Sequence, residues 1–201
     1  MKKKIIYIQL LFIILLSQQS IFSFDSPASK AVGIFLTTGV GARFPVGQFA
    51  NSSNLGYGIS VDASYTDSDH LPFFLFARFG YEQFPGSQDF YQQSDYSNYS
   101  TTLVPISVGL RYYFSPLVES AILLMPIIEA SASYTYFQVL NEFKVDSGKS
   151  DYTEDSWNFG GTIGAGFSMF ILEIIGNYSY YESTQYFSVN LNVRLPLFIN
   201  M

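Results

Sequence analysis

Eight short stretches in which large apolar residues alternate with small or polar ones follow one another from Lys30 to near the C-terminus. They cover residues 30–44, 56–66, 73–84, 102–114, 121–138, 157–168, 170–181 and 185–197. In the second stretch Ile59 and Val61 have one parity, whereas Ser60 and Asp62 have the other. Because successive side chains of a strand point to opposite sides, this period predicts strands with one apolar and one polar face. We therefore expect an all-β chain.

The composition of the two faces favours a membrane barrel over a soluble β-protein. The apolar rows are long, and some end in tyrosine on both sides, such as Tyr57 and Tyr65. The opposite parity holds glycine, serine, threonine, asparagine and nearly every arginine. Outward apolar rows with aromatic ends and a polar interior are typical of transmembrane β-barrels. An even number of strands closes such a barrel without an edge. The sequence thus predicts a transmembrane antiparallel up-and-down barrel of eight strands.

The lengths of the connections give the expected orientation. Long connections cover residues 45–55, 85–101 and 139–156, and short ones cover 67–72, 115–120, 168–170 and 182–184. Transmembrane barrels have short periplasmic turns and longer outer loops, so we expect the long connections outside, with 182–184 as a short exception. A helix over 118–132 is the competing interpretation of the fifth stretch. Pro126 and the later alternation favour a strand.

The N-terminus has the pattern of an export signal. Lys2, Lys3 and Lys4 precede an apolar run at 5–16, and serines follow at 17, 20 and 23. The run is too short to span a bilayer, which argues against the alternative of a membrane anchor. We expect a cleaved signal peptide over residues 1–23 and a barrel domain over 24–201. The absence of cysteine excludes a lipoprotein and disulfides. The acidic remainder makes nucleic acid an unsuitable partner.

Three segments resemble the eight-stranded outer-membrane β-barrel family typified by OmpA and OmpX. They are residues 39–47 (GVGARFPVG), 108–114 (VGLRYYF) and 189–195 (VNLNVRL). The resemblance extends over about residues 30 to 198. It implies location in the bacterial outer membrane, contact with lipid and lipopolysaccharide, and insertion by the barrel-insertion machinery. That machinery reads a terminal aromatic residue in the family, and here Phe198 lies three residues before the end.

Eight charged residues have the inward parity. They are Arg43, Asp62, Arg78, Glu82, Arg111, Glu129, Glu173 and Arg194. An eight-stranded barrel has an interior just wide enough for side chains to fill, and an isolated buried ion costs several kcal/mol. We therefore expect these residues to pair in a structural charge network that plugs the lumen. The alternative is a small pore for ions or small solutes.

No catalytic, cofactor-binding or metal-binding residue is predicted. The single histidine, His70, lies in a short turn without a second catalytic group, and a solvated histidine is the simpler interpretation. The acidic third outer loop lacks the spacing of a calcium site. The tyrosine-rich second loop is a candidate contact surface for an extracellular partner. We expect a monomeric, non-enzymatic outer-membrane protein with a structural or surface-interaction role; transport, a soluble lipocalin-like carrier and an enzyme are the alternatives, in that order.

Overall fold

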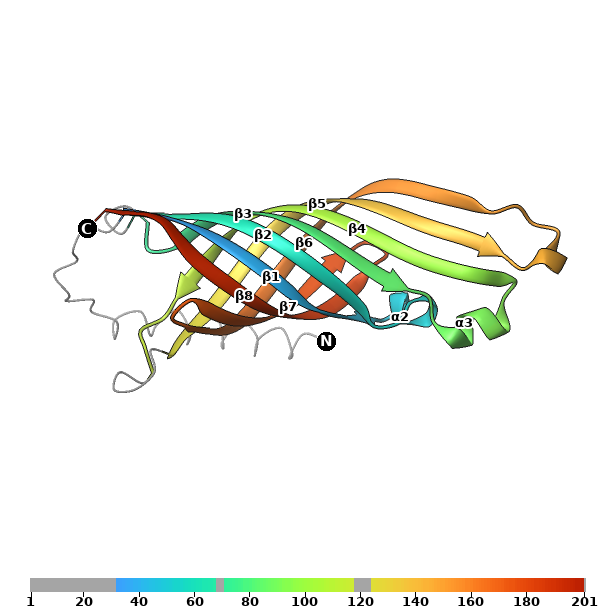
Figure 1. The fold of residues 1–201 in the computed structure, drawn as a ribbon, viewed down its shortest axis with the longest axis horizontal. Coiled ribbons are helices and arrows are strands. Elements are labelled where there is room, and N and C mark those ends of the chain that lie inside the picture. Colours follow the sequence, from blue (N-terminus) through green and yellow to red (C-terminus); the bar gives the residue numbers. More distant parts are fainter. Residues whose placement is uncertain (1–31, 68–70, 118–123, 201) are drawn as a thin grey trace, which may run out of the picture.

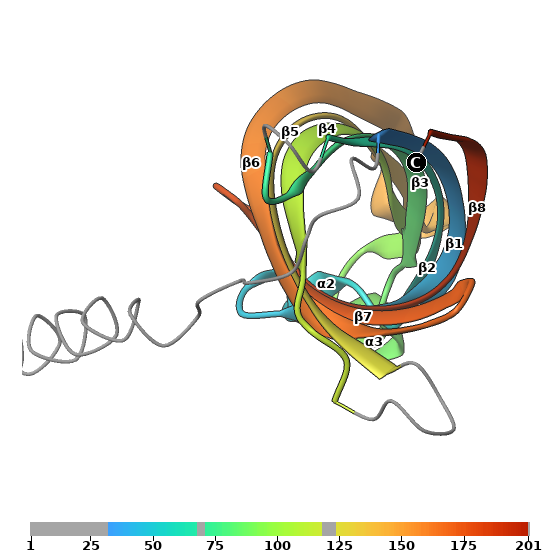
Figure 2. The ribbon, with the colours of Figure 1, turned by 90° about the vertical axis from the view of Figure 1, so that its left-hand side faces the viewer.

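The computed structural model describes residues 32–67, 71–117 and 124–200. Eight strands follow one another as β1 (Val32–Val46), β2 (Gly56–Asp67), β3 (Phe74–Pro85), β4 (Tyr96–Tyr113), β5 (Leu124–Phe143), β6 (Tyr152–Met169), β7 (Leu172–Tyr181) and β8 (Gln185–Asn200). They form a closed antiparallel barrel in chain order, as Figures 1 and 2 show. The predicted fold class is therefore confirmed. The predicted signal peptide and His70 lie outside the described residues.

The barrel closes by pairing the first strand with the last. β1 pairs with β2 on one side and with β8 on the other, where Val46 lies opposite Gln185. Because every strand pairs with two neighbours in the barrel wall, the ring has no open sheet edge within the bilayer, as a bilayer requires. We call the end at which β1 begins and β8 ends the terminal end, and the opposite end the loop end.

The outer wall of the barrel carries the predicted apolar rows. Val108 is 56% exposed and Ile163 is 64% exposed, although both are large aliphatic residues in mid-strand. Near the loop end, Trp157 stacks on Tyr134 with ring centroids 4.8 Å apart. An exposed aliphatic belt with aromatic residues toward its rim is the outer surface of a membrane barrel. Within the described residues, no helix is long and apolar enough to cross a membrane.

The loops predicted over residues 85–101 and 139–156 are shorter than expected, because their flanking strands are longer. β4 begins at Tyr96 instead of residue 102, β5 continues to Phe143 instead of residue 138, and β6 begins at Tyr152 instead of residue 157. Tyrosine, threonine, valine and phenylalanine favour strands even outside lipid. Cross-strand ring pairs add support, such as Tyr96 on Phe143 at 4.6 Å.

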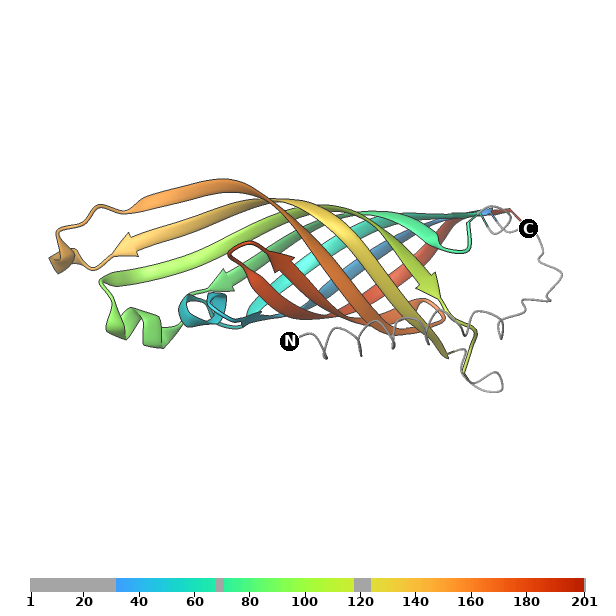
Figure 3. The same cartoon turned by 180° about the vertical axis from the view of Figure 1, so that it is seen from behind.

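These extensions form a sheet that projects from the loop end (Figures 1 and 3). The pairing of β3 with β4 stops at Pro85 and Ser100, and that of β6 with β7 stops at Gly160 and Tyr181. Beyond these points only β4, β5 and β6 pair with one another. We call residues 96–99, 134–143 and 152–159 the protruding sheet. Among the described residues, no strand pairs with the outer edge of 152–159.

Two local details differ from the expectation. Phe170 belongs to the turn before β7, where it adopts a positive φ of 55°. The competing helix over 118–132 does not form in the described part, since the favoured strand β5 starts at Leu124. Two short helices, α2 (Phe49–Ser52) and α3 (Gln88–Gln93), lie in the loops after β1 and β3, where none was expected. Helices this short have no periodicity that a sequence pattern can show.

The exposed belt predicts a strong penalty for charge on the lipid side. Val108→Arg, near the middle of β4, should lower the free energy of unfolding by about 2–4 kcal/mol, since an arginine at the bilayer midplane faces hydrocarbon. Urea-induced unfolding in lipid vesicles measures this. The control is Val145→Arg, because Val145 is fully exposed in the β5–β6 loop and should tolerate the same change. Equal stability of the two variants would show that the assigned facing is wrong.

Candidate functional site

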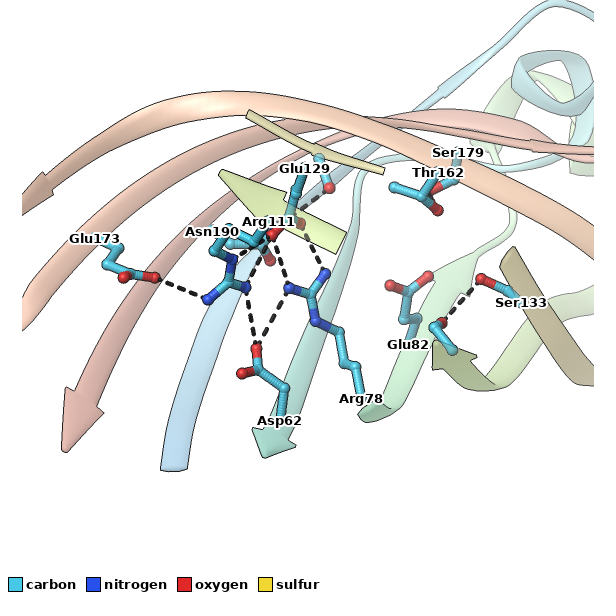
Figure 4. A network of polar contacts seen from close by, with 12 residues as sticks. Asp62, Arg78, Glu82, Arg111, Glu129, Ser133, Thr162, Glu173, Ser179 and Asn190 are labelled. Carbon is cyan, nitrogen blue, oxygen red and sulfur yellow. Dashed lines mark hydrogen bonds and ion pairs between the residues drawn. The ribbon is translucent and has the colours of Figure 1, made fainter. Parts of the chain in front are cut away.

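Arg111 lies at the centre of a cluster of charges inside the barrel (Figure 4). Its side chain is fully buried and lies on β4 directly opposite Glu129 of β5. The Arg111 Nη2 atom is 2.8 Å from Glu129 Oε2 and 3.2 Å from Asp62 Oδ2, and Nη1 is 3.4 Å from Glu173 Oε2. One guanidinium thus contacts carboxylates from three other strands. Its planar fork of five donors suits this task better than an ammonium group would.

Arg78 joins the same carboxylates from the other side. It lies on β3 opposite Asp62 of β2, and its Nη2 is 3.3 Å from Asp62 Oδ2. Its two terminal nitrogens donate to the two oxygens of Glu129, at 3.0 and 3.1 Å. A bidentate pair of this kind fixes the orientation of both groups. Arg78 and Arg111 therefore hold Glu129 between them.

Arg194 extends the cluster toward the terminal end. Its Nη1 is 3.7 Å from Glu173 Oε1, and that oxygen also accepts a hydrogen bond of 2.7 Å from the Tyr113 hydroxyl. The Arg194 guanidinium carbon lies 3.9 Å from the ring centre of Phe35 and 4.5 Å from that of Phe74. Aromatic faces stabilise a cation that has lost water. This end of the lumen is thus filled by one arginine and the rings around it.

A separate ion pair lies nearer the loop end. Arg43 Nε is 2.8 Å from Glu82 Oε1, and Arg43 Nη1 donates to Asn190 Oδ1 at 2.8 Å. The guanidinium lies against Gly58, where an added Cβ would come within 2.6 Å of Arg43 Nη2. A glycine is needed there, because any side chain would displace the arginine from its partners. All eight predicted lumen residues thus form ion pairs, and both groups have equal numbers of cations and anions.

An aromatic cap, which the sequence pattern did not reveal, covers the loop end of the lumen. Its members are Phe49, Phe84, Leu103, Phe137, Tyr181 and Tyr186, all buried. Phe84 contacts Phe49 of α2 at 4.9 Å and Tyr186 at 5.2 Å between ring centroids. Five of the six members have the inward parity of a strand, which was the available signal. Phe49 lies in a loop, and no strand pattern includes it.

Between the cap and the central cluster lies a small polar cavity of about 40 Å³. Its walls include Ser60, Ser107, Ser133 and Asn177, and Arg43 and Arg78 border it from opposite ends. The volume is sufficient for ordered water but not for a larger solute. Within the described residues, no group of three or more acidic or histidine side chains is arranged to hold a metal ion.

A closed barrel of eight antiparallel strands, with an exposed aliphatic belt and a charged, densely filled interior, defines the class of the protein. It is an eight-stranded β-barrel of the outer-membrane type. The fold and the belt together confirm the predicted location in the outer membrane.

Three solved structures are similar to this chain, and the first of them supports the barrel fold. Neisserial surface protein A (NspA) matches with a TM-score of 0.52 and 16% identity, over 82% of this chain and 97% of that protein. The N-terminal β-barrel domain of Pseudomonas aeruginosa OprF has a TM-score of 0.45 and 15% identity, over 83% and 100%. Yersinia pestis Ail has a TM-score of 0.44 and 11% identity, over 84% and 100%. No protein-family model and no curated protein matches the chain.

The central cluster predicts a large effect of removing one charge. Arg111→Ala leaves three buried carboxylates with one cation fewer, and should lower the free energy of unfolding by about 3–5 kcal/mol. Urea-induced unfolding of the folded barrel in vesicles is the measurement. Lys149→Ala is the control, because Lys149 is exposed in a loop and its loss leaves no buried charge. If Arg111→Ala unfolds at the same urea concentration as the control, water reaches the cluster.

Proposed function

We propose that this protein is a non-enzymatic outer-membrane anchor with a closed lumen, which presents its loop end to the cell surroundings for surface contacts. The observation that carries the proposal is the combination of a lumen filled at both ends with a sheet that continues beyond the barrel. A pore would need an open lumen. A barrel with a purely structural role would not need a sheet that continues beyond the barrel.

Two layers of side chains support a closed lumen. The Arg111 cluster joins β2, β3, β4, β5 and β7 across the full width of the barrel, and the aromatic cap covers the loop end. Between the two layers lie the Arg43–Glu82 ion pair and a cavity of about 40 Å³. An ion crossing the barrel would have to break several buried ion pairs, each of which is costly to leave unpaired. The eight charged lumen residues therefore act as a structural plug.

Contacts between loops support a rigid contact surface. The Lys144 Nζ atom donates to the backbone oxygens of Tyr91 and Ser94 at 2.8 and 2.7 Å. Lys149 Nζ is 2.8 Å from Asp95 Oδ2. That hydrogen bond lowers the pKa of Asp95 and raises the pKa of Lys149. These contacts fasten the β5–β6 loop to the segment before β4.

The edge of the protruding sheet offers one mode of contact. Residues 152–159 of β6 present backbone groups that no described strand pairs with, and an extended peptide binds such an edge by adding a strand. Glu154 and Asp155 on this segment disfavour self-association of the edge. In this proposal residues 1–23 direct export, residues 24–201 form the barrel, and the insertion machinery, lipid and lipopolysaccharide are its partners.

Conductance tests the closed lumen. Purified protein inserted into planar bilayers should give no steady channels, since ion pairs and the aromatic cap occupy the path. Insertion is verified by the shift in gel mobility between heated and unheated protein, and an open porin serves as the positive control. Steady, ion-selective channels from the folded wild-type barrel would contradict the proposal and favour the transport alternative.

Protease sensitivity tests the orientation. The four arginines of the chain form ion pairs in the lumen, so trypsin has few accessible sites in the barrel. Trypsin added to intact cells should cut after Lys149, which follows the exposed Gly148 at a positive φ of 68°. It should cut more slowly after Lys144, whose ammonium is held by two carbonyls. Lys149→Gln should abolish the main cut. Cleavage that appears only after the outer membrane is permeabilised would show that the loop end faces the periplasm, opposite to the expected orientation.

A further inference from the structure

The loops after β1 and β3 enclose a pocket of about 820 Å³ at the loop end, between α2 and α3. Both helices lie beside each other there in Figures 1 and 2. The volume is in the range of small-molecule sites, which is roughly 300–1,000 Å³. Such sites are usually apolar, whereas eight of the ten residues that line this one carry a hydroxyl, amide or carboxylate group. The pocket therefore suits a ligand that is itself rich in hydrogen-bonding groups.

Several of these polar groups have no partner in the protein. The side chains of Asn51, Gln88, Asp89 and Gln93 make no hydrogen bond or ion pair with any described residue, and all four are exposed to the pocket region. Ser53 differs, because it is only 3% exposed and its Oγ atom still lacks a hydrogen-bond partner. A buried hydroxyl without a partner costs free energy. A ligand that reaches the floor of the pocket would satisfy it.

The frame of the pocket is fixed before any ligand binds. Ser53 and Gly86 form a β-bridge, and Ser87 N donates to Ser52 O at 2.9 Å. The N-cap of α3 is closed by a bond of 3.2 Å from Phe90 N to Ser87 Oγ. On the other side, Phe49 anchors α2 in the aromatic cap. A ligand would thus meet side chains on a backbone that is already ordered, which reduces the entropic cost of binding.

The chemistry of the lining defines the ligand class. Amide side chains both donate and accept, as hydroxyl groups do, and Asp89 adds an acceptor. Phe90 contributes an apolar ring at one wall, suited to the C–H face of a sugar. No lysine or arginine lies among the described lining residues, so an anionic ligand has no counter-charge there. We infer that this pocket binds a neutral saccharide.

This inference rests on the proposed function, since it names a ligand for the surface that the anchor presents. Two sources offer neutral sugars at this position: the uncharged outer sugars of the cell's own lipopolysaccharide and a glycan of another cell. The binding experiment therefore includes both.

Saccharide binding is measured by saturation-transfer NMR on the full barrel in phosphatidylcholine nanodiscs, prepared without glycoside detergents. Lactose, maltose and chitobiose represent external neutral glycans, a dephosphorylated outer-core oligosaccharide of uncharged sugars represents the cell's own lipopolysaccharide, and a sulfated heparin disaccharide is the anionic comparison. We expect saturable binding of at least one neutral saccharide and at least tenfold weaker binding of the sulfated one. A stronger signal from the core or from the external glycans identifies the source.

Two neighbouring glutamines provide a matched pair of variants. Gln93 lines the pocket, whereas the equally exposed Gln92 on the same helix does not. Gln93→Ala should weaken binding at least fivefold, and Gln92→Ala should change it less than twofold. Ser53→Ala should weaken binding as well while the melting temperature is retained, because its hydroxyl has no partner to lose.

The inference is overturned if no neutral saccharide gives saturable binding to folded protein, or if Gln93→Ala and Gln92→Ala bind equally well. These outcomes are independent of the lumen. A barrel that conducts ions would contradict the proposed function and leave the saccharide titration unchanged, whereas a silent barrel without saccharide binding would overturn only this inference.

Discussion

Pairing of buried charges is the constraint on which the interior depends. The eight charged lumen residues come from every strand except β6, so neutrality is reached only when almost the whole ring is assembled. β6 instead contributes glycines, which leave room for the side chains of the neighbouring strand. A Cβ at Gly164 would come within 1.8 Å of Asn177 Oδ1, and one at Gly160 within 2.3 Å of the Tyr181 ring. Side chains of β7 thus occupy the space beside the glycines of β6, so the glycines and the paired charges together allow the interior to be filled.

The facing of the strands could be predicted because a strand has a strict period of two. Val108 and Arg111 fall on opposite sides by parity alone, and the structure places them there. The choice of partners could not be predicted. Arg111 lies opposite Glu129 only in the observed register, and a shift by one residue would face every side chain the other way. Arg43 contacts Glu82 across an intervening strand, a relation that depends on how the sheet curves.

The ends of the strands were harder to predict than their middles, and for a different reason. Within the bilayer, the solvent imposes alternation between lipid and lumen. Above it, both faces of the sheet meet water, so the pattern weakens although the strand continues, as at Tyr152–Phe159 of β6. Phe49 of the aromatic cap was missed for a related reason, because it reaches the lumen from a loop. Polar residues around α2 and α3 form a pocket only through backbone bridges between two loops, and spacing in one segment does not reveal them.

The outer rim of the barrel is uneven in height. β7 and β8 are joined by a tight turn, closed by a 2.9 Å bond from Tyr181 N to Thr184 O, while β5 and β6 continue for many residues past the same level. Eight residues of strand add roughly 25 Å along the strand direction. The protruding sheet therefore stands high on one side of the loop end, whereas the β7–β8 turn on the other side is low. A molecule that approaches from the side of the β7–β8 turn can reach the α2–α3 region directly, whereas one that approaches from the opposite side first meets the protruding sheet. The uneven height of the loop end thus restricts the direction from which any partner can reach the α2–α3 region.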